Sequence, residues 1–533
     1  MAFLDQWLLT ILIFLPTAGA AVTLLAPGRD AARRAAVAAT VVTFLASLLL
    51  LATFDWDRAG AYDYGGAGVV QMVKQAPWID ALNVQYFVGL DGLSFPLVIL
   101  STFTFVLAAV ASWNVERMTK GYMALLLLLE TGILGTFLSL DLFLFYVFFE
   151  VSLLPMYFLI GIWGGPRREY AAIKFFLYTL VGSIGLLIAL IGTYLYTRQI
   201  TGIPDVAGGT FDLVKLARPD VRAALGAAGL AGPVAKALFA LLMLGFLVKV
   251  PAVPVHTWLP DAHVEAPTPI SMILAAVLLK MGGYGIFRVA YPLFPEAARE
   301  LWLPVAVIGV VSILYGALCA MGQSDFKKLV AYSSVSHMGF VVLGAAMMTP
   351  AAVSGALFMM VAHGITSAMM FFVVGVLYDR AHHRELGRFG GIATTMPVYT
   401  GFSTLACFAN LGLPGLCGFV GEFLVLVGSF QAARAGGSIL LDGGYATRGQ
   451  VLTLAVLACF GVVLTAGYML WAVQRVFFGP EKPEYKGFPD VNARELAILT
   501  PLAALAILLG VLPGVFVFAY TETTVAALMR LFA

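Results

Sequence analysis

The sequence contains about fourteen long apolar runs, which constrain the fold more than any other feature. An α-helix rises 1.5 Å per residue, so about 20 apolar residues cross the hydrocarbon core of a bilayer, which is about 30 Å thick. Only 11% of the residues are charged, whereas a soluble domain has about 25%. The chain is therefore predicted to be an all-α polytopic protein of the lipid bilayer. The runs cover approximately residues 4–25, 33–53, 87–112, 121–139, 141–162, 170–196, 234–255, 264–289, 302–321, 327–346, 350–378, 397–430, 451–475 and 495–520.

Two of these runs contain helix breakers near mid-membrane. Pro251 and Pro254 follow Lys249, and Pro414 lies among glycines in the segment 410–422. Proline removes a backbone donor and clashes with the preceding turn, so both helices are predicted to be discontinuous. Backbone freed from a helix inside the bilayer must line protein or water, and broken helices mark the transport site of many transporters.

The positions of the two breaks suggest an internal repeat. Five runs over about 121–289 and five over about 302–475 each include one broken helix, and an odd number of spans inverts the topology of a repeat. No polar connection is long enough for a separate globular domain. We therefore expect one integral membrane domain over residues 1–533, with a core at about 121–475 and flanking helices at 4–112 and 495–520. The first run lacks the basic segment of a signal peptide, so we expect it to be retained.

Composition excludes several functions. The formal net charge of +2 is spread over the chain without a basic block, so nucleic acid is not an expected partner. The four cysteines lie inside apolar runs without metal-ligand spacing and are interpreted as small core residues. Since there is also no Gly-rich phosphate loop, we expect no metal and no cofactor on this chain.

Lys and Arg are unevenly distributed between the connections, which predicts the orientation. Cytoplasmic connections of membrane proteins are enriched in these residues. Placing both termini outside puts most of the connecting basic residues inside, namely Arg29, Arg33, Arg34, Arg117, Lys120, Arg167, Arg168, Lys327, Lys328, Arg380, Arg384, Arg388, Arg475, Lys482, Lys486 and Arg494. Both termini are therefore predicted to lie outside.

Ionisable side chains near the middle of apolar runs carry the signal for function. A charged residue at the centre of a membrane helix costs about 2.5–3.5 kcal/mol, which is tolerable where charges pair, change protonation state or meet internal water. Such chains usually move ions or protons. The residues are Glu150, Lys249, Lys280, His337 and His363, with Glu422 slightly off centre.

Glu150 and Lys249 are interpreted as a buried pair whose partners influence each other's protonation. The alternative for Glu150 is a neutral carboxyl that bonds to a neighbouring helix. Lys280 lies eleven residues after Pro269, or about 16 Å along a helix, which is near mid-depth. A lysine there can exchange protons, or it can simply bond to a carbonyl beside a helix break.

The two histidines at mid-depth, His337 and His363, are either relay residues or satisfied core residues, and the sequence favours neither. Glu422 follows the second break towards the outside and would suit the group that releases protons there. The roles of three further residues stay open. Glu130 is either structural or lies at an interface with a neighbouring subunit, while His256 and His263 lie at the inner membrane interface or contribute to a water entry.

Several motifs resemble the antiporter-like membrane subunits of respiratory complex I and the related multisubunit cation/proton antiporters. They are Phe149-Glu150-Val151-Ser152-Leu153-Leu154-Pro155, Lys249-Val250-Pro251, His256-Thr257-Trp258-Leu259-Pro260-Asp261-Ala262-His263 and Ala266-Pro267-Thr268-Pro269, followed by Lys280. The resemblance implies fourteen helices with two broken ones over nearly the whole chain. It also implies a proton-translocating subunit of NADH:quinone oxidoreductase, with quinone reduction elsewhere and no redox centre here.

The resemblance further assigns roles to the ionisable residues. Glu150 and Lys249 would be the modulating pair, Lys280 the central proton carrier, His337 and His363 members of a hydrophilic axis, and Glu422 the terminal group. Glu422 stands where the sister subunits of complex I and the antiporter relatives usually carry lysine. Among these relatives, the resemblance therefore favours a complex I subunit other than those sisters. Implied partners are the other membrane-arm subunits, especially two sister antiporter-like subunits and the lateral helix of one of them. Flavin, iron-sulfur clusters and quinone would belong to partner subunits.

Rival functions are a subunit of a multisubunit cation/proton antiporter, a passive scaffold whose charges serve helix packing, and a small-solute carrier. The Ala/Gly-rich composition points to a bacterial inner membrane rather than a mitochondrial one.

Overall fold

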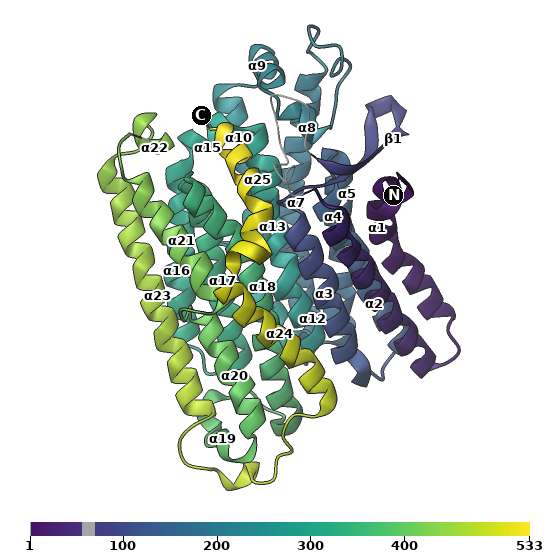
Figure 1. The fold of residues 1–533 in the computed structure, drawn as a ribbon, viewed down its shortest axis with the longest axis vertical. Helices are drawn as coiled ribbons and strands as arrows, with labels where there is room; N and C mark the ends of the chain where they lie inside the picture. Colours follow the sequence, from purple (N-terminus) through teal and green to yellow (C-terminus); the bar gives the residue numbers. More distant parts are fainter. Residues whose placement is uncertain (1, 56–69, 437, 533) are drawn as a thin grey trace.

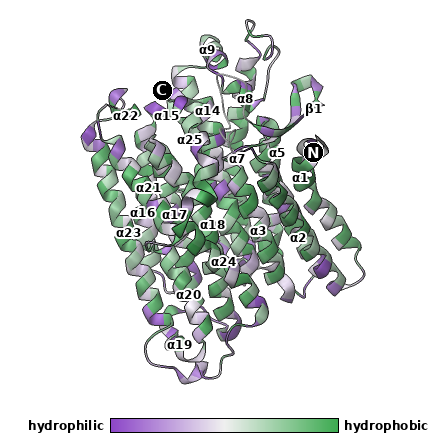
Figure 2. Ribbon diagram, in the orientation of Figure 1, coloured by the Kyte–Doolittle hydropathy of each residue, from purple (hydrophilic) through white to green (hydrophobic). Residues whose placement is uncertain are grey.

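The computed structural model describes residues 2–55, 70–436 and 438–532. Within these ranges, thirteen helices are long and apolar enough to cross a membrane. They stand side by side as one bundle, and both chain termini lie towards the same end of it (Figure 1), here called the terminal end. Hydrophilic residues gather at the terminal end and at the opposite end, and apolar residues dominate the helices between (Figure 2).

The helices of the bundle follow the predicted apolar runs closely. The thirteen long helices are α1 Ala2–Leu25, α2 Arg29–Thr53, α3 Phe95–Ala111, α4 Thr119–Leu138, α5 Leu142–Val151 with α6 Leu153–Trp163, α7 Arg168–Thr197, α10 Gly232–Lys249, the helix Thr268–Leu293, α16 Trp302–Met321, α17 Phe326–Ala346, α18 Pro350–Ala381, α23 Arg448–Val476 and α24 Ala493–Val511. The helix Thr268–Leu293 comprises α12 Thr268–Ile273, α13 Leu279–Gly285 and α14 Tyr291–Leu293, with irregular turns between them. The remaining predicted run, 397–430, contains two shorter helices, α20 Pro397–Asn410 and α21 Cys417–Ala432. Shorter helices are α8 Leu213–Leu216, α9 Pro219–Ala227, α11 Trp258–Glu265, α15 Pro295–Glu300, α19 Ile392–Thr395, α22 Ile439–Asp442 and α25 Ala519–Arg530.

Two stretches differ from the predicted runs. The run 87–112 begins as a strand: β1 Gln71–Ile79 and β2 Val84–Leu90 form an antiparallel hairpin, and α3 starts only at Phe95. The last run, 495–520, is interrupted after Val511 at Pro513, and the chain continues as α25. Proline cannot extend the hydrogen bonds of the preceding turn, which explains the second difference.

The centre of the bundle is formed by the helices that carry the mid-membrane ionisable residues. Every residue in the most apolar window of α18 and of the helix Thr268–Leu293 is buried, compared with 28% in α2. α18 packs against α17, α21 and α12, so Lys280, His337 and His363 come from neighbouring central helices. This position shields their side chains from lipid.

Both predicted breaks are present. α10 ends at Lys249, and a non-helical segment leads to α11, so the proline-rich stretch interrupts the helix as expected. α20 and α21 are separated by a turn in which Gly412 and Gly415 have φ of 78° and 91°, a backbone region that favours glycine.

A third irregularity surrounds Lys280 and was not predicted. The helix Thr268–Leu293 contains two π-helical turns, Leu274–Leu278 and Ile286–Ala290, on either side of α13. A π-turn shifts the hydrogen-bond register and leaves a carbonyl available to a side chain; such turns are frequent at functional sites.

Matched features at the two ends of the bundle support the inverted repeat, which we retain as a proposal. Asp141 caps α5 by accepting from the backbone N–H groups of Phe143 and Leu144, and it forms an isolated bridge with Asp212. In the second half, Asp325 caps α17 in the same way and forms a bridge with Glu385. Each cap begins the second helix of its five-helix set, and each bridge reaches the connection between the third and fourth helices.

Candidate functional site

Lys280 lies at the centre of the candidate site, where its ammonium bonds to two acceptors. The side chain is fully buried, and its Nζ donates to the carbonyl oxygen of Ala275 at 2.5 Å. That carbonyl belongs to the first π-helical turn, so the irregular backbone supplies an acceptor. Nζ also lies 2.6 Å from Nδ1 of His363 on α18. The lysine is thus held at a carbonyl beside a helix irregularity and is also joined to another titratable group.

The two mid-membrane histidines continue from Lys280 towards α20 and α21. Lys280, His363, His337 and Glu422 are called the buried line below. The ring centroids of His363 and His337 are 5.6 Å apart, and both side chains are buried. His337 uses both ring nitrogens: Nδ1 lies 3.1 Å from Oε1 of Glu422, and Nε2 lies 2.9 Å from Oδ1 of Asn410. Sequence alone could not place these rings side by side; the packing of α17 against α18 does so.

The second helix break positions Glu422. Gly412 lies so close to this carboxylate that a Cβ added to the glycine would be 2.6 Å from Oε2. Asn410, the last residue of α20, presents its side chain to His337 at the same break. The loop between the two half-helices therefore surrounds the end of the line with backbone and one amide.

Glu150 and Lys249 form a second, looser group beside the first break. Among the described residues, no N–O contact within 4.0 Å joins them, so they are not a contact ion pair. Their charges nevertheless interact, and Lys249 Nζ lies 4.6 Å from the centre of the Phe149 ring. A Cβ at Gly282 would be 2.9 Å from Cβ of Lys249, which places Lys249 next to the helix of Lys280.

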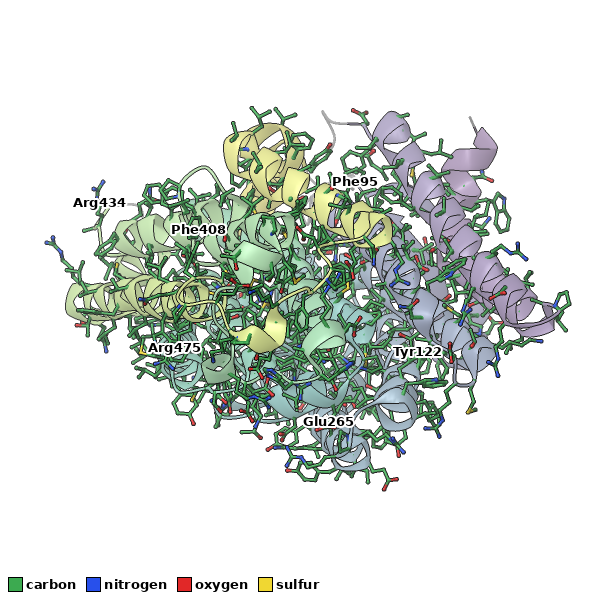
Figure 3. All side chains as sticks on the ribbon, turned by 90° about the horizontal axis from the view of Figure 1, so that it is seen from below. Phe95, Tyr122, Glu265, Phe408, Arg434 and Arg475 are labelled. Carbon is green, nitrogen blue, oxygen red and sulfur yellow. The ribbon has the colours of Figure 1, made fainter. Side chains whose placement is uncertain are left out.

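A cavity of about 410 Å³ opens at the end opposite the termini. Its lining includes Glu265, labelled in Figure 3, together with Lys327 and Asp379. Lys327 is buried and donates to the carbonyl oxygen of Ala266 at 2.6 Å. The end of α11 and the start of α12 line this cavity, so it lies beside the short helix that follows the first break.

His263 lies between this cavity and the central lysine. It is fully buried and stacks on Phe371 with a centroid distance of 4.1 Å, and neither ring nitrogen has a hydrogen-bond partner among the described residues. It interacts electrostatically with both Lys327 and Lys280.

His256 and Glu130 are more isolated. The His256 ring is buried and packs edge-on against Tyr315, with centroids 5.4 Å apart. Glu130 on α4 is 0% exposed, and neither carboxylate oxygen has a hydrogen-bond partner within the described part of the chain. An enclosed Glu130 has no surface to offer a neighbouring subunit.

Several polar residues of the site were not identified from the sequence. Asn410 was part of a motif noted for its glycines, and Lys327 was counted only as a connecting charge. Asp91 and Arg288, both 1% exposed, form an ion pair with Nη2 and Oδ2 2.5 Å apart. A search for charged residues near the ends of apolar runs could have found this pair. In the described ranges, no group of three or more His, Cys, Asp or Glu residues is arranged to hold a metal ion.

Comparison with known proteins assigns the chain to a family. A family model described as NADH:quinone oxidoreductase/Mrp antiporter, TM, matches residues 139–441, and one described as NADH-ubiquinone oxidoreductase chain 4, amino terminus, matches residues 40–140. Subunit M of NADH-quinone oxidoreductase from Rhodobacter capsulatus is 44% identical over 520 residues, covering 96% of this chain and 94% of that protein.

Solved structures agree with this assignment. A chain of respiratory complex I from Thermus thermophilus with bound NADH matches with a TM-score of 0.82 and 32% identity, covering 98% of this chain and 100% of that chain. A chain of the Mrp complex from Dietzia sp. has a TM-score of 0.78 and is 22% identical, covering 99% and 98%, and thus shares the fold. The fold and the line of buried ionisable residues define an antiporter-like membrane protein. Within that class, the chain belongs to the family of NADH-quinone oxidoreductase subunit M, or chain 4.

Proposed function

We propose that this chain is a proton-translocating subunit in the membrane arm of NADH:quinone oxidoreductase. The observation that carries the proposal is the line of neighbouring buried titratable groups from Lys280 through His363 and His337 to Glu422. Amine, imidazole and carboxylate can each bind and release a proton. A line with two hydrogen-bond contacts and one ring-to-ring step of 5.6 Å is suited to passing protons between them.

The proposed orientation gives the line a direction. With the basic connections inside, the cavity with Glu265 and Lys327 faces the cytoplasm, and the terminal end faces outwards. Protons would enter through the cavity and pass His263 to reach Lys280. Glu422 lies beyond the second break, towards the terminal end, and would release them outwards.

Glu150 and Lys249 would couple this line to chemistry elsewhere in the complex. Without a contact ion pair, the distance between the two charges can change without breaking a hydrogen bond between them. When the Glu150 carboxylate stays close, it balances the Lys249 ammonium. When it moves away, the unbalanced positive charge acts on the neighbouring Lys280 and favours transfer of its proton to His363, since buried charges interact strongly at low dielectric.

The wider assignments follow from the family and are part of the proposal. The relatives are named as subunits of NADH-quinone oxidoreductase, which supports other membrane-arm subunits as partners, among them the two sister antiporter-like subunits and the lateral helix of chain 5. Flavin, iron-sulfur clusters and quinone would be bound by partner subunits. Bacterial relatives such as that of Rhodobacter capsulatus support a bacterial inner membrane.

The coupling role is tested with Glu150→Gln and Lys249→Ala in the assembled complex. We expect both variants to lower NADH:quinone turnover and membrane potential, because each removes one charge of the modulating pair. Near-normal values for both variants would exclude this role. Co-purification with flavin and iron-sulfur subunits separates the proposal from a cation/proton antiporter working without NADH, which Glu422 makes less suitable.

A further inference from the structure

Five aromatic side chains form a continuous cluster on the terminal side of the two buried lysines. The cluster consists of Phe137, Phe145, Phe149, Phe246 and Tyr284, all at most 2% exposed. Tyr284 contacts Phe137 and Phe145, with centroids 5.2 and 6.3 Å apart. Phe145, Phe149 and Phe246 lie within 6.3 Å of one another. Four helices, α4, α5, α10 and α13, thus contribute to one apolar layer.

The aromatic cluster borders both lysines directly. Phe149 is the ring against which the Lys249 ammonium rests. Tyr284 follows Lys280 by four residues, or about 6 Å along the helix towards the terminal end. The rings therefore lie between both ammonium groups and the terminal end of this helix.

Glycines let the rings close tightly over the helix. A Cβ at Gly285 would lie 2.2 Å from the Phe246 ring, and one at Gly282 would lie 2.6 Å from the Phe246 carbonyl oxygen. Larger residues would push α10 away from α13 and open the layer. The two glycines therefore remove the space that water would need.

Polar contacts hold Tyr284 in place on the terminal side. Its hydroxyl donates to the carbonyl oxygen of Phe137 at 2.8 Å and accepts from Nε of Arg288 at 2.8 Å. Arg288 is in turn fixed by its ion pair with Asp91, whose Oδ1 accepts from the backbone N–H groups of Leu93 and Ser94. Buried ion pairs are weak evidence for stability, because desolvation offsets their attraction. Their contacts do fix the orientation of what they bond.

We propose that the aromatic cluster, fixed by Asp91 and Arg288, is a water barrier that stops protons returning from the outer side to Lys280 and Lys249. Apolar constrictions exclude water from pores, and a proton cannot cross a dry layer of rings. The barrier rests on the proposed function, since only a proton-carrying lysine needs it. It leaves the line through Glu422 as the outward route.

The barrier is tested by passive proton entry into proteoliposomes that contain the assembled complex and no NADH. A potassium diffusion potential drives protons inwards, and a trapped pH dye reports the rate. We expect Tyr284→Ala to raise the rate about fivefold or more and Phe145→Leu, which removes a ring but keeps most of the apolar volume, about twofold. Tyr399→Ala is the matched control, because Tyr399 is also fully buried and donates to a backbone carbonyl, that of Val373.

The outcomes separate the barrier from the proposed function. Entry rates of Tyr284→Ala and Phe145→Leu equal to the rate of Tyr399→Ala would overturn the barrier. If Tyr284→Ala does not assemble, Phe145→Leu decides alone. Adding Lys280→Ala to Tyr284→Ala should restore a slow rate, and a persistent leak would show that the rings do not shield Lys280. Without NADH, none of these results depends on whether the parent complex pumps.

Discussion

Replacing His337 with glutamine separates proton transfer from structural support. His337 bonds to two buried oxygens, Oε1 of Glu422 at 3.1 Å and Oδ1 of Asn410 at 2.9 Å. Leaving a buried polar group without a partner costs about 1–3 kcal/mol, so an apolar replacement would cost about 2–6 kcal/mol for the two. A glutamine amide can still bond to either oxygen, and the cost should fall to about 1 kcal/mol or less. Glutamine does not titrate, however, and cannot relay a proton.

The expected loss of transport is much larger than the loss of stability. Without the ring, no titratable group stands between His363 and Glu422, and a proton could cross this gap only through water. Glutamine occupies most of that space. A positioned acid–base group contributes about 10²–10⁴ to a proton-transfer rate, so we expect transfer along this line to slow by about 100-fold.

The assay compares three quantities in membranes that contain the assembled complex. They are NADH oxidation with an artificial electron acceptor, NADH:quinone turnover, and the membrane potential during turnover. We expect His337→Gln to leave the first unchanged and to lower the other two. His383→Gln is the control, because His383 lies in a connection and bonds to the Tyr485 hydroxyl at 3.0 Å. A normal membrane potential and turnover in His337→Gln would refute the relay.

Three further predictions concern the second helix break and a helix cap. Asn410→Leu leaves His337 Nε2 without its partner, and we expect a lower membrane potential with an assembled complex; an unchanged potential would mean that the amide is dispensable. Gly412→Ala should impair pumping more than Gly415→Ala, since both have positive φ but only Gly412 contacts Glu422; equal proton yields would contradict this. Asp141 precedes the span Leu142–Trp163, and burial raises the pKa of its carboxyl from 3.8 to about 6. The folded protein therefore favours the protonated carboxyl, and the free energy of unfolding that this form contributes is present at low pH and is lost as pH rises towards 6. Asp141→Asn keeps the cap and should therefore gain about 1 kcal/mol relative to the parent between pH 5 and pH 7, measured by thermal unfolding of the purified complex, and parallel pH curves would refute this.

Much of the fold could be predicted because its determinants are local in sequence. Apolar runs of spanning length located the helices, and the prolines after Lys249 and at 414 located the two breaks. The hairpin β1–β2 was missed because it depends on pairing between strands. The π-helical turns around Lys280 were missed because the segment has no distinctive turn residue.

The site was predictable in membership but not in contacts. Position at the middle of apolar runs identified Lys280, His337 and His363 as buried, and the structure brings these three and Glu422 into one line. Glu150 and Lys249 were expected as a buried pair, yet Glu150 is only partly buried and the structure leaves the two residues without a contact ion pair. The two residues lie on different helices, and the packing of these helices sets the distance between them. The Asp91–Arg288 pair was missed because the search considered only the middle of apolar runs, and both residues lie near the ends of theirs.

The number of protons moved per NADH oxidised by reconstituted complex with Lys280→Ala tests the central claim most directly. Lys280 is the first group of the buried line, and its Nζ lies 2.6 Å from Nδ1 of His363, the next group. If the line carries protons, an assembled Lys280→Ala complex should move fewer protons per NADH than the parent. An assembled Lys280→Ala complex that still moves as many protons per NADH as the parent would contradict the account. It would show that the buried charges only support helix packing.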